Sequence, residues 1–161
     1  MIYYYRLTKY DPTFRDERGH YKNLNEWTGI DIVGKKINRK IFTLKDYLVV
    51  ENDYLNVLKN NLIKNSVSRM SISEIEYYPK SNKKILGFSR HEIVNTELIC
   101  DIARLVFRDE MWCKFSNGKI FIHFGDDFYV YFSSRHKIFD NNVGFKKFGR
   151  VYVEEFKSPY C

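Results

Sequence analysis

The chain has 161 residues, of which 44% are hydrophobic and 29% are charged, and it contains only 3 Pro and 8 Gly. This composition supplies enough apolar side chains for a buried core, so it excludes an intrinsically disordered chain. No apolar run reaches the ~18–20 residues of a membrane-spanning helix, and the first residues lack the layout of a signal peptide. We therefore expect a single domain over residues 1–161, located in the cytoplasm.

The chain is also basic and rich in aromatic side chains. It has 27 Lys and Arg against 20 Asp and Glu, a formal net charge of +7, and 17% Phe, Trp and Tyr. A positive net charge attracts nucleic acids and other anions without specificity. The dominance of Lys, Asn, Ile, Phe and Tyr is equally typical of biased codon usage in an AT-rich genome, so charge alone assigns no function.

Residues 2–10, with the sequence IYYYRLTKY, predict a strand that lies at least partly inside a sheet, because they are aromatic and β-branched. Odd-numbered residues would share one face and even-numbered residues the other. The Asp-Pro pair that follows ends this strand. From there an irregular charged loop is expected over about residues 11–42, with one short helical turn near residues 26–32.

A helix is predicted over residues 44–64. Thr43 supplies the capping hydroxyl, and Asp46 stands at the third helical position, where it faces the first free amides. The side chains behind this cap recur with spacings of three and four, and Glu51 is the one residue that breaks their apolar pattern. The stripe consists of Leu44, Tyr47, Leu48, Glu51, Leu55, Leu58 and Leu62.

A short strand is expected at about residues 68–77, and its imperfect alternation favours a position at the sheet edge. Ser89 and Glu92, in the sequence SRHE, then have the spacing of a capping box. The apolar residues behind them recur with helical spacing to about Arg108. These features predict a second helix near residues 90–108.

Residues 110–134 carry the clearest β pattern of the chain. The runs EMWCKF, KIFIHF and FYVYFSS are separated by Ser-Asn-Gly and Gly-Asp-Asp, which are typical hairpin turns because Asn, Asp and Gly tolerate positive φ. Three antiparallel strands are predicted, the third with Phe128, Val130 and Phe132 on one face. A last strand, RVYVEEF, precedes Ser158 and Pro159.

This order of elements lacks βαβ alternation and indicates an α+β fold, with an antiparallel sheet of about five to six strands and two amphipathic helices on one face. The opposite face would be unusually aromatic, and so many rings are rarely left in water. Either the long loop or a binding partner is expected to cover it. The aromatic residues assigned to this face are Tyr4, Trp112, Phe121, Tyr129, Tyr131 and Tyr152.

Few side chains are arranged for chemistry. His123, in the middle of a strand, could act as a general base with Asp126 or Asp127, although a structural strand histidine fits the same position. The remaining histidines show no metal-ligand spacing, no phosphate-binding or dinucleotide-binding glycine motif is present, and the three cysteines form no CxxC pair. We expect no cofactor, no metal and reduced thiols.

Two kinds of segment suggest binding. The loop from Arg15 to Tyr21 combines forked cations with an aromatic ring and could hold a phosphate or a carboxylate, although a solvated turn has the same composition. Basic runs interleaved with aromatic residues could form a groove for phosphates and stacked bases, although scattered lysines are usually only a solvated face. These runs are Lys35–Lys40, Lys80–Lys84 and Arg135–Lys147.

Several segments, among them RDERGHY, EWTGIDIVG, FIHFGDDFYVYF and VYVEEFKSPY, resemble a family of small uncharacterised bacterial proteins. The resemblance covers nearly the whole chain and implies an immunity or antitoxin partner of a polymorphic toxin. Gly29, Val33, Asp126 and Phe128 depart from the family pattern. Lys157 replaces an acidic residue, which speaks against an acidic nuclease inhibitor.

The leading hypothesis is a non-enzymatic module that masks a protein partner, such as a toxin, as an immunity-type or antitoxin-type inhibitor. Tyr, Trp and Arg side chains anchor protein interfaces, and no membrane partner is expected. One alternative is a nucleic-acid-binding or nucleic-acid-processing protein that uses the basic runs, in phage defence or anti-defence. Another is a small enzyme with His123 and Asp127 at its centre. The predicted partner-binding residues are Arg15, Arg18, Tyr21, Trp27, Trp112, His123, Tyr129 and Tyr131.

Overall fold

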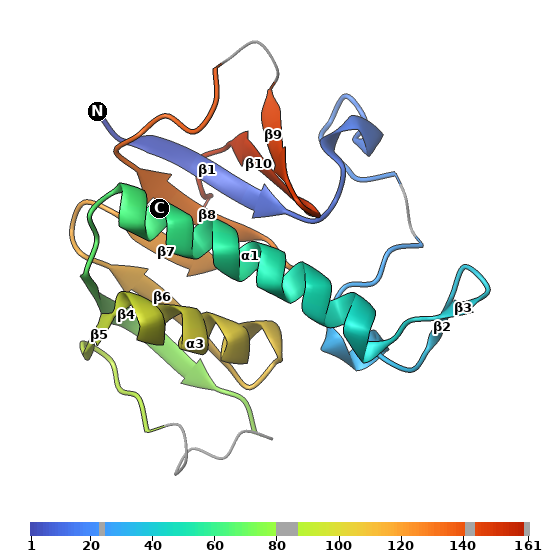
Figure 1. Cartoon of the computed structure of the whole chain (residues 1–161), viewed down its shortest axis with the longest axis horizontal. Coiled ribbons are helices and arrows are strands. Elements are labelled where there is room, and N and C mark those ends of the chain that lie inside the picture. Colours follow the sequence, from blue (N-terminus) through green and yellow to red (C-terminus); the bar gives the residue numbers. More distant parts are fainter. Residues whose placement is uncertain (23–24, 80–86, 141–143, 160–161) are drawn as a thin grey trace.

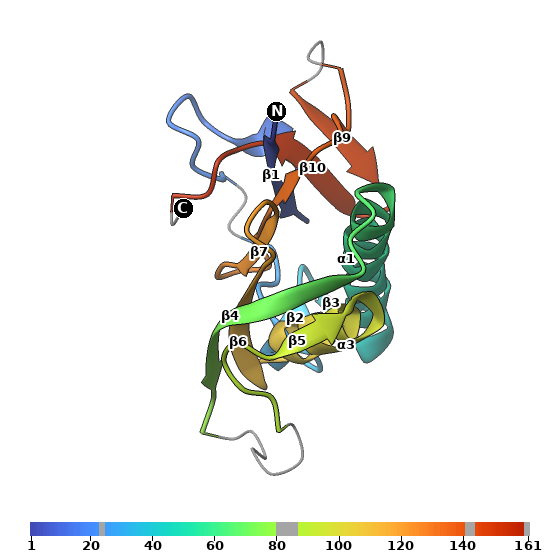
Figure 2. The ribbon, with the colours of Figure 1, turned by 90° about the vertical axis from the view of Figure 1, so that its left-hand side faces the viewer.

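The computed structural model describes residues 1–22, 25–79, 87–140 and 144–159. Its main body is an antiparallel sheet of eight strands with two helices on one face (Figures 1 and 2). The helices are α1 (Leu44–Lys64) and α3 (Thr96–Phe107). In chain order the strands of this sheet are β1 (Tyr3–Thr8), β4 (Arg69–Tyr77), β5 (Ile93–Asn95), β6 (Met111–Ser116), β7 (Phe121–Phe124), β8 (Val130–Ser134), β9 (Phe145–Phe148) and β10 (Val151–Glu155).

The order across the sheet is β5-β4-β6-β7-β8-β1-β10-β9. The α+β class with two helices and an antiparallel sheet is confirmed, whereas the expectation of five to six strands is wrong. The two additional strands, β5 and β9, are short and lie at the two edges of the sheet. Short strands are difficult to predict because they carry too few residues to establish an alternating pattern.

Strand β1 lies inside the sheet, between β8 and β10, as its composition predicts. Tyr5 and Leu7 are fully buried on the face that packs against the helices. Tyr4 and Arg6 lie on the opposite face, where Tyr4 contacts the ring of Phe121. The predicted alternation of this strand is therefore confirmed.

Helix α1 begins where the cap predicts. The hydroxyl of Thr43 accepts a hydrogen bond from the Asp46 amide, and the Asp46 carboxylate accepts one from the Thr43 amide. Tyr47, Leu55, Leu58 and Leu62 are buried as expected, but Leu44 is 52% exposed. Val50 and Tyr54 are buried in addition. Among the described residues, no helix combines the length and the apolar character needed to cross a membrane.

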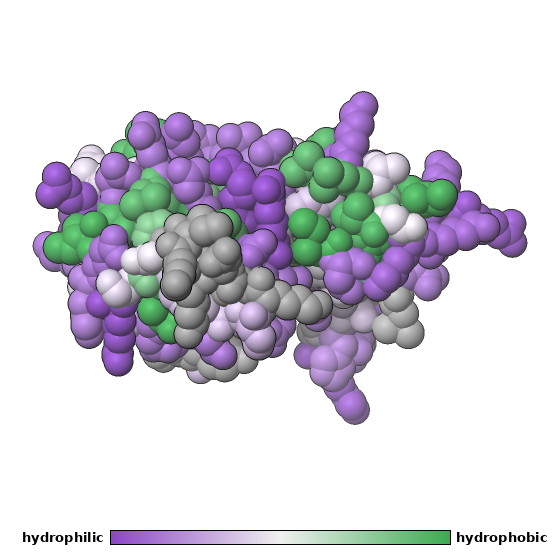
Figure 3. Space-filling model, turned by 90° about the horizontal axis from the view of Figure 1, so that it is seen from below, coloured by the Kyte–Doolittle hydropathy of each residue, from purple (hydrophilic) through white to green (hydrophobic). Residues whose placement is uncertain are grey.

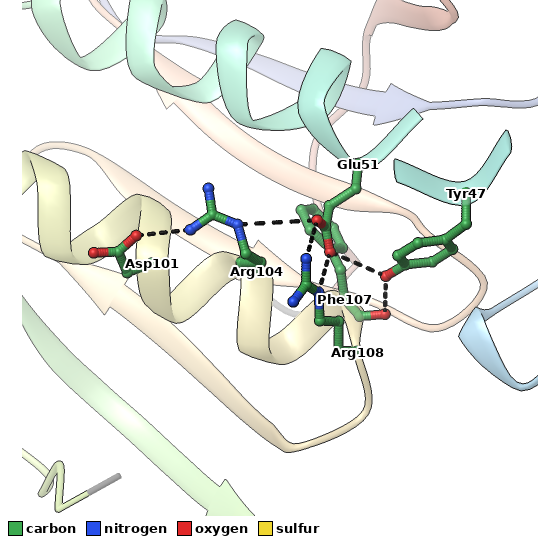
Figure 4. A network of polar contacts seen from close by, with 6 residues as sticks. All are labelled: Tyr47, Glu51, Asp101, Arg104, Phe107 and Arg108. Atoms are coloured by element: carbon green, nitrogen blue, oxygen red, sulfur yellow. Dashed lines mark hydrogen bonds and ion pairs between the residues drawn. The ribbon is translucent and has the colours of Figure 1, made fainter. Parts of the chain in front are cut away.

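Glu51 breaks the apolar pattern of α1 for a structural reason (Figure 4). Its side chain is only 1% exposed, and its two carboxylate oxygens accept hydrogen bonds of 2.8 and 2.7 Å from the Arg108 guanidinium. Tyr47 donates to the Phe107 carbonyl at 2.7 Å and lies 3.3 Å from the same carboxylate. Glu51 therefore joins α1 to the end of α3.

The second helix begins later than predicted. Ser89 and Glu92 do interact, because the Ser89 amide donates to the Glu92 carboxylate at 3.0 Å, but no helix follows them. The backbone of residues 91–95 instead pairs with β4, and α3 begins after Asn95, whose side chain accepts from the Leu98 amide. The predicted start near residue 90 is wrong because strand pairing replaces the helix there.

Strand β4 is not an edge strand, contrary to expectation, since it lies between β5 and β6. Its imperfect alternation comes from a β-bulge between Ile72 and Glu74. Before the bulge, Met70 and Ile72 point toward the helices and are buried. After it, Ile75 packs against the core, so the extra residue restores the apolar face.

The segment between β1 and α1 contains more structure than expected. It includes the 3-10 turns η1 (Pro12–Phe14) and η2 (Ile30–Ile32), the second of which lies within the predicted short turn. It also includes a hairpin of β2 (Lys36–Ile37) and β3 (Lys40–Ile41) that projects from the body (Figure 1). Ile41 is 65% exposed, and hydrophobic side chains gather at this end of the molecule (Figure 3).

The meander of β6, β7 and β8 forms as predicted, with Gly118 at positive φ in its first turn. In the second turn Asp127 and Phe128 both adopt positive φ, of 52° and 63°. Phe128 therefore belongs to the turn and not to β8, which corrects its predicted position. Its ring is nevertheless buried, stacked on Phe107 at 5.0 Å.

Candidate functional site

The face of the main sheet opposite α1 and α3, here called the outer face, is covered in part by the chain itself. Figure 2 shows the helices on one side of the sheet and, on the other, the segment after β1 together with the C-terminal segment. The covering residues come from 11–22 and 156–158. The aromatic face predicted from the sequence therefore exists, and much of it lies beneath a second layer.

A buried ion-pair cluster joins the two layers. Glu154 on β10 accepts hydrogen bonds from Arg6 at 2.9 Å and from Arg15 at 2.6 Å. The three side chains are only 11–13% exposed. Charge-assisted hydrogen bonds of this kind are strong when they are shielded from water. Arg15, a predicted partner-binding residue, therefore anchors its loop to the sheet.

Aromatic rings fill the space around this cluster. The ring of Tyr10 lies 5.0 Å from that of Tyr21 and 5.6 Å from that of Tyr129. Phe14 meets Tyr21 edge to face at 6.4 Å and is 53% exposed. The structure thus brings two of the predicted residues, Tyr21 and Tyr129, into one cluster. Phe14, which sequence analysis did not single out, forms its outermost ring.

Arg18 lies in an exposed turn next to this cluster. The Asp16 carboxylate accepts hydrogen bonds from the backbone amides of Arg18 at 2.9 Å and His20 at 2.8 Å. These backbone hydrogen bonds, that from His20 above all, hold the pKa of Asp16 below its usual range. Gly19, at φ 81°, closes the turn. The turn therefore holds its backbone in place and leaves the Arg18 guanidinium facing solvent.

His123 and Tyr131 lie under the C-terminal segment. They are 5% and 7% exposed, and the His123 Nδ1 atom lies 3.4 Å from the Ser158 hydroxyl. Burial, together with the charge of Lys114, lowers the pKa of His123, so the imidazole is neutral at neutral pH. Phe156 lies over Tyr131 at 5.9 Å and is 38% exposed. Phe156 is therefore the more exposed of the two rings.

The two carboxylates proposed as partners of His123 act electrostatically on different groups. The charge of Asp126 acts on the pKa of His123, whereas the charge of Asp127 acts on the pKa of Lys9. The Lys9 side chain is 3% exposed, and burial lowers its pKa to about 8, with Glu26 opposing the shift. Sequence analysis missed Lys9, because nothing in the strand pattern indicates that a terminal lysine is enclosed.

Trp27 lies apart from the aromatic cluster, at the end of the molecule where α1 begins. Its ring stacks on Phe42 at 4.8 Å and meets Phe128 at 5.1 Å. The Lys9 ammonium lies 4.2 Å from the Trp27 ring centre and 4.0 Å from that of Tyr10, so Lys9 connects the two groups. Trp27 is thus chiefly a packing residue on a half-buried surface.

Trp112 borders an acidic hollow of about 340 Å³ at one end of the sheet. A Cβ atom on Gly29 would lie 3.1 Å from the Asp31 carboxylate and 3.7 Å from that of Asp109, so these two groups converge. Burial and the charge of Asp31 raise the pKa of Asp109. Four carboxylates line the hollow, which suits a cationic side chain. They belong to Asp31, Asp109, Asp126 and Asp127.

Within the described parts of the chain, no group of three or more His, Cys, Asp or Glu side chains is arranged to hold a metal ion. Cys100 and Cys113 are free thiols, and Cys161 lies outside the described residues. The basic run Lys80–Lys84 also lies outside them. No family model, no curated protein and no solved structure matches this chain.

Proposed function

We propose that this protein is a non-enzymatic binding module that masks a protein partner with its outer face, as an immunity-type or antitoxin-type inhibitor. The observation that carries the proposal is the aromatic and cationic layer, which presents two exposed rings, Phe14 and Phe156, and the exposed Arg18. Aromatic and arginine side chains dominate the energetics of protein interfaces. A layer fixed from beneath also loses little conformational entropy on binding.

The chemistry of the surface defines the partner it fits. Arg18 and Lys157 would face acidic groups of the partner, while the acidic hollow beside Trp112 would accept one of its Lys or Arg side chains. Mixed charge of this kind favours a protein surface over a uniformly anionic nucleic acid. Arg15, His123 and Tyr131 support the surface from beneath and do not form contacts of their own in this proposal.

The test uses the product of the gene adjacent to this one, purified as the candidate toxin. Phe14→Ala, Phe156→Ala and Arg18→Glu should each weaken the complex by about 2 kcal/mol or more, or about thirtyfold in Kd, as expected for anchor residues. Isothermal titration calorimetry measures the Kd. Circular dichroism confirms that each variant keeps the fold, which is expected because all three residues are exposed.

Matched controls come from the rest of the surface. Ile93→Ala removes a side chain that is 67% exposed at the far edge of the sheet, and Arg39→Glu reverses a charge at the β2–β3 turn. Both variants should bind as tightly as the unchanged protein. Equal binding by the outer-face variants and the controls would show that the partner uses another surface.

A further inference from the structure

A second hollow, of about 350 Å³, lies between α1 and the edge strand β9, away from the acidic hollow. Figure 2 shows β9 beside one end of α1. Its volume falls within the ~300–1,000 Å³ that is usual for small-molecule sites. The residues that line it combine amides, ammonium groups and apolar side chains.

Helix α1 supplies one wall. Asp53, Asn56, Asn60 and Lys64 follow one another with spacings of three and four, which places them on one side of the helix. Asp53 is already engaged, because its carboxylate accepts a hydrogen bond from the Arg150 amide at 2.9 Å. The side-chain amides of Asn56 and Asn60 and the Lys64 ammonium also line the hollow and could engage a ligand.

Asn61 is the residue that points most directly to a ligand. It lines the hollow, is 8% exposed, and its side-chain Nδ2 atom has no hydrogen-bond partner among the described residues. Buried polar atoms are nearly always paired, since an unpaired donor has lost its water without a replacement. A ligand with a carbonyl, ring-nitrogen or phosphate acceptor would supply the missing partner.

Strand β9 supplies the opposite wall. The ring of Phe148 is half-buried, and the Lys146 ammonium lies 5.2 Å from its centre. Lys64 and Lys146 therefore line the hollow from two elements, and the Phe148 ring lines it next to Lys146. Sites for single-stranded nucleic acids and nucleotides combine cationic side chains that contact the phosphate with an aromatic ring on which a base stacks.

We propose that this hollow binds a nucleotide, with its base on Phe148, an acceptor of the base on Asn61, and its phosphate between Lys64 and Lys146. The nucleotide could be free or part of a single strand, since both present the same base and phosphate. A simple carboxylate would engage the lysines but would leave the ring and the amide unused. The proposal is independent of the outer face, which lies on the other side of the sheet from α1.

The test is a ¹⁵N NMR titration of the full chain with AMP, UMP, ribose 5-phosphate and a labelled ten-nucleotide single strand. The nucleotides should shift the side-chain amide signals of Asn61 and Asn60, and ribose 5-phosphate should bind more weakly. Phe148→Leu, which keeps an apolar side chain, should weaken nucleotide binding at least about fivefold by removing the stacking surface. Lys64→Gln with Lys146→Gln should reduce the salt dependence of binding.

Lys119→Gln is the matched control, because this exposed lysine lies in the β6–β7 turn and does not line the hollow. Binding of AMP or UMP with these effects supports a free nucleotide, and binding of the strand alone with the same effects supports a nucleic-acid source. The proposal is overturned if no probe binds, if Phe148→Leu binds all probes as tightly as the unchanged protein, or if Lys119→Gln weakens binding as much as the lysine pair.

Discussion

At the scale of single residues, the most informative side chains are charges that the fold encloses. Glu51 interrupts the apolar stripe of α1, and the sequence shows that interruption but not its cause. Its partner Arg108 lies 57 positions away in the chain, at the end of a different helix. Such a pair depends on how two elements pack, so no local pattern predicts it.

Removing the charge of Arg108 and removing the charge of Glu51 should reduce the stability of the protein by unequal amounts. Arg108→Ala leaves a carboxylate that is 1% exposed without its main partner and should reduce the free energy of unfolding by about 3–5 kcal/mol. Glu51→Gln keeps an acceptor for Arg108, whose own side chain is 35% exposed, and should cost less. Urea unfolding measures both, and equal losses would contradict the assignment of Glu51 as the buried member.

Lys9 predicts a specific dependence of stability on pH. Its pKa falls from 10.5 to about 8 on folding, so between these values the unfolded chain binds more protons than the folded one. The free energy of unfolding should therefore rise with pH over this window, by about 2 kcal/mol between pH 7.5 and 9.5 from this group. Lys9→Met should lose that rise in urea unfolding, and an unchanged pH slope in the variant would refute it.

At the scale of elements, prediction succeeds where the determining interactions are local. The cap formed by Thr43 and Asp46 lies within one turn of α1, and the Asn-Gly turn within one hairpin. It fails where two local preferences compete, as at Ser89, whose capping spacing is overruled by the pairing of residues 93–95 with β4. The strands at the two sheet edges were missed because they are too short to establish an alternating pattern.

In the second turn of the meander, the glycine variant of Phe128 should be more stable than the alanine variant, which is the reverse of the usual order. Phe128 has φ 63° and a buried ring, so Phe128→Ala loses the ring and should cost about 3–5 kcal/mol. Phe128→Gly loses the same ring but removes the strain of positive φ, so it should be about 1–2 kcal/mol more stable than the alanine variant. Urea unfolding of both variants measures the difference.

The control for this pair is Phe132 on β8, which is 1% exposed and is not among the residues at positive φ. There the glycine variant should be less stable than the alanine variant, by about 0.5–1 kcal/mol, because glycine loses more freedom on folding. If the Phe128→Gly variant is less stable than the Phe128→Ala variant, the turn is not strained.

At the scale of the whole molecule, the residues that make up the outer face could be predicted, but the exposure of each residue could not. Alternation along the strands places Tyr131 and His123 opposite the helices, as the structure confirms. Their burial depends on the C-terminal segment, whose Phe156 and Ser158 return to the sheet. A segment without periodic pattern gives no indication of where it packs, so the covered and exposed parts of this face could not be distinguished in advance.

The net charge of +7 predicts only weak attraction to double-stranded DNA. The bases of double-stranded DNA are stacked within the duplex and cannot reach Phe148, so the interaction should be electrostatic and without sequence preference. In a mobility-shift assay the affinity should fall steeply as salt rises, with a slope set by the number of phosphates neutralised. A tight duplex complex that persists at physiological salt would instead make nucleic-acid binding the leading function.

The most direct test of masking is a titration of the candidate toxin, the purified product of the adjacent gene, with this protein, at a concentration of that product well above the Kd of the complex. A module that only masks its partner must be consumed as it acts, so residual toxin activity should fall linearly to a break at roughly equimolar protein. An enzyme is regenerated after each turnover. Complete neutralisation by far less than an equimolar amount, increasing with incubation time, would contradict masking.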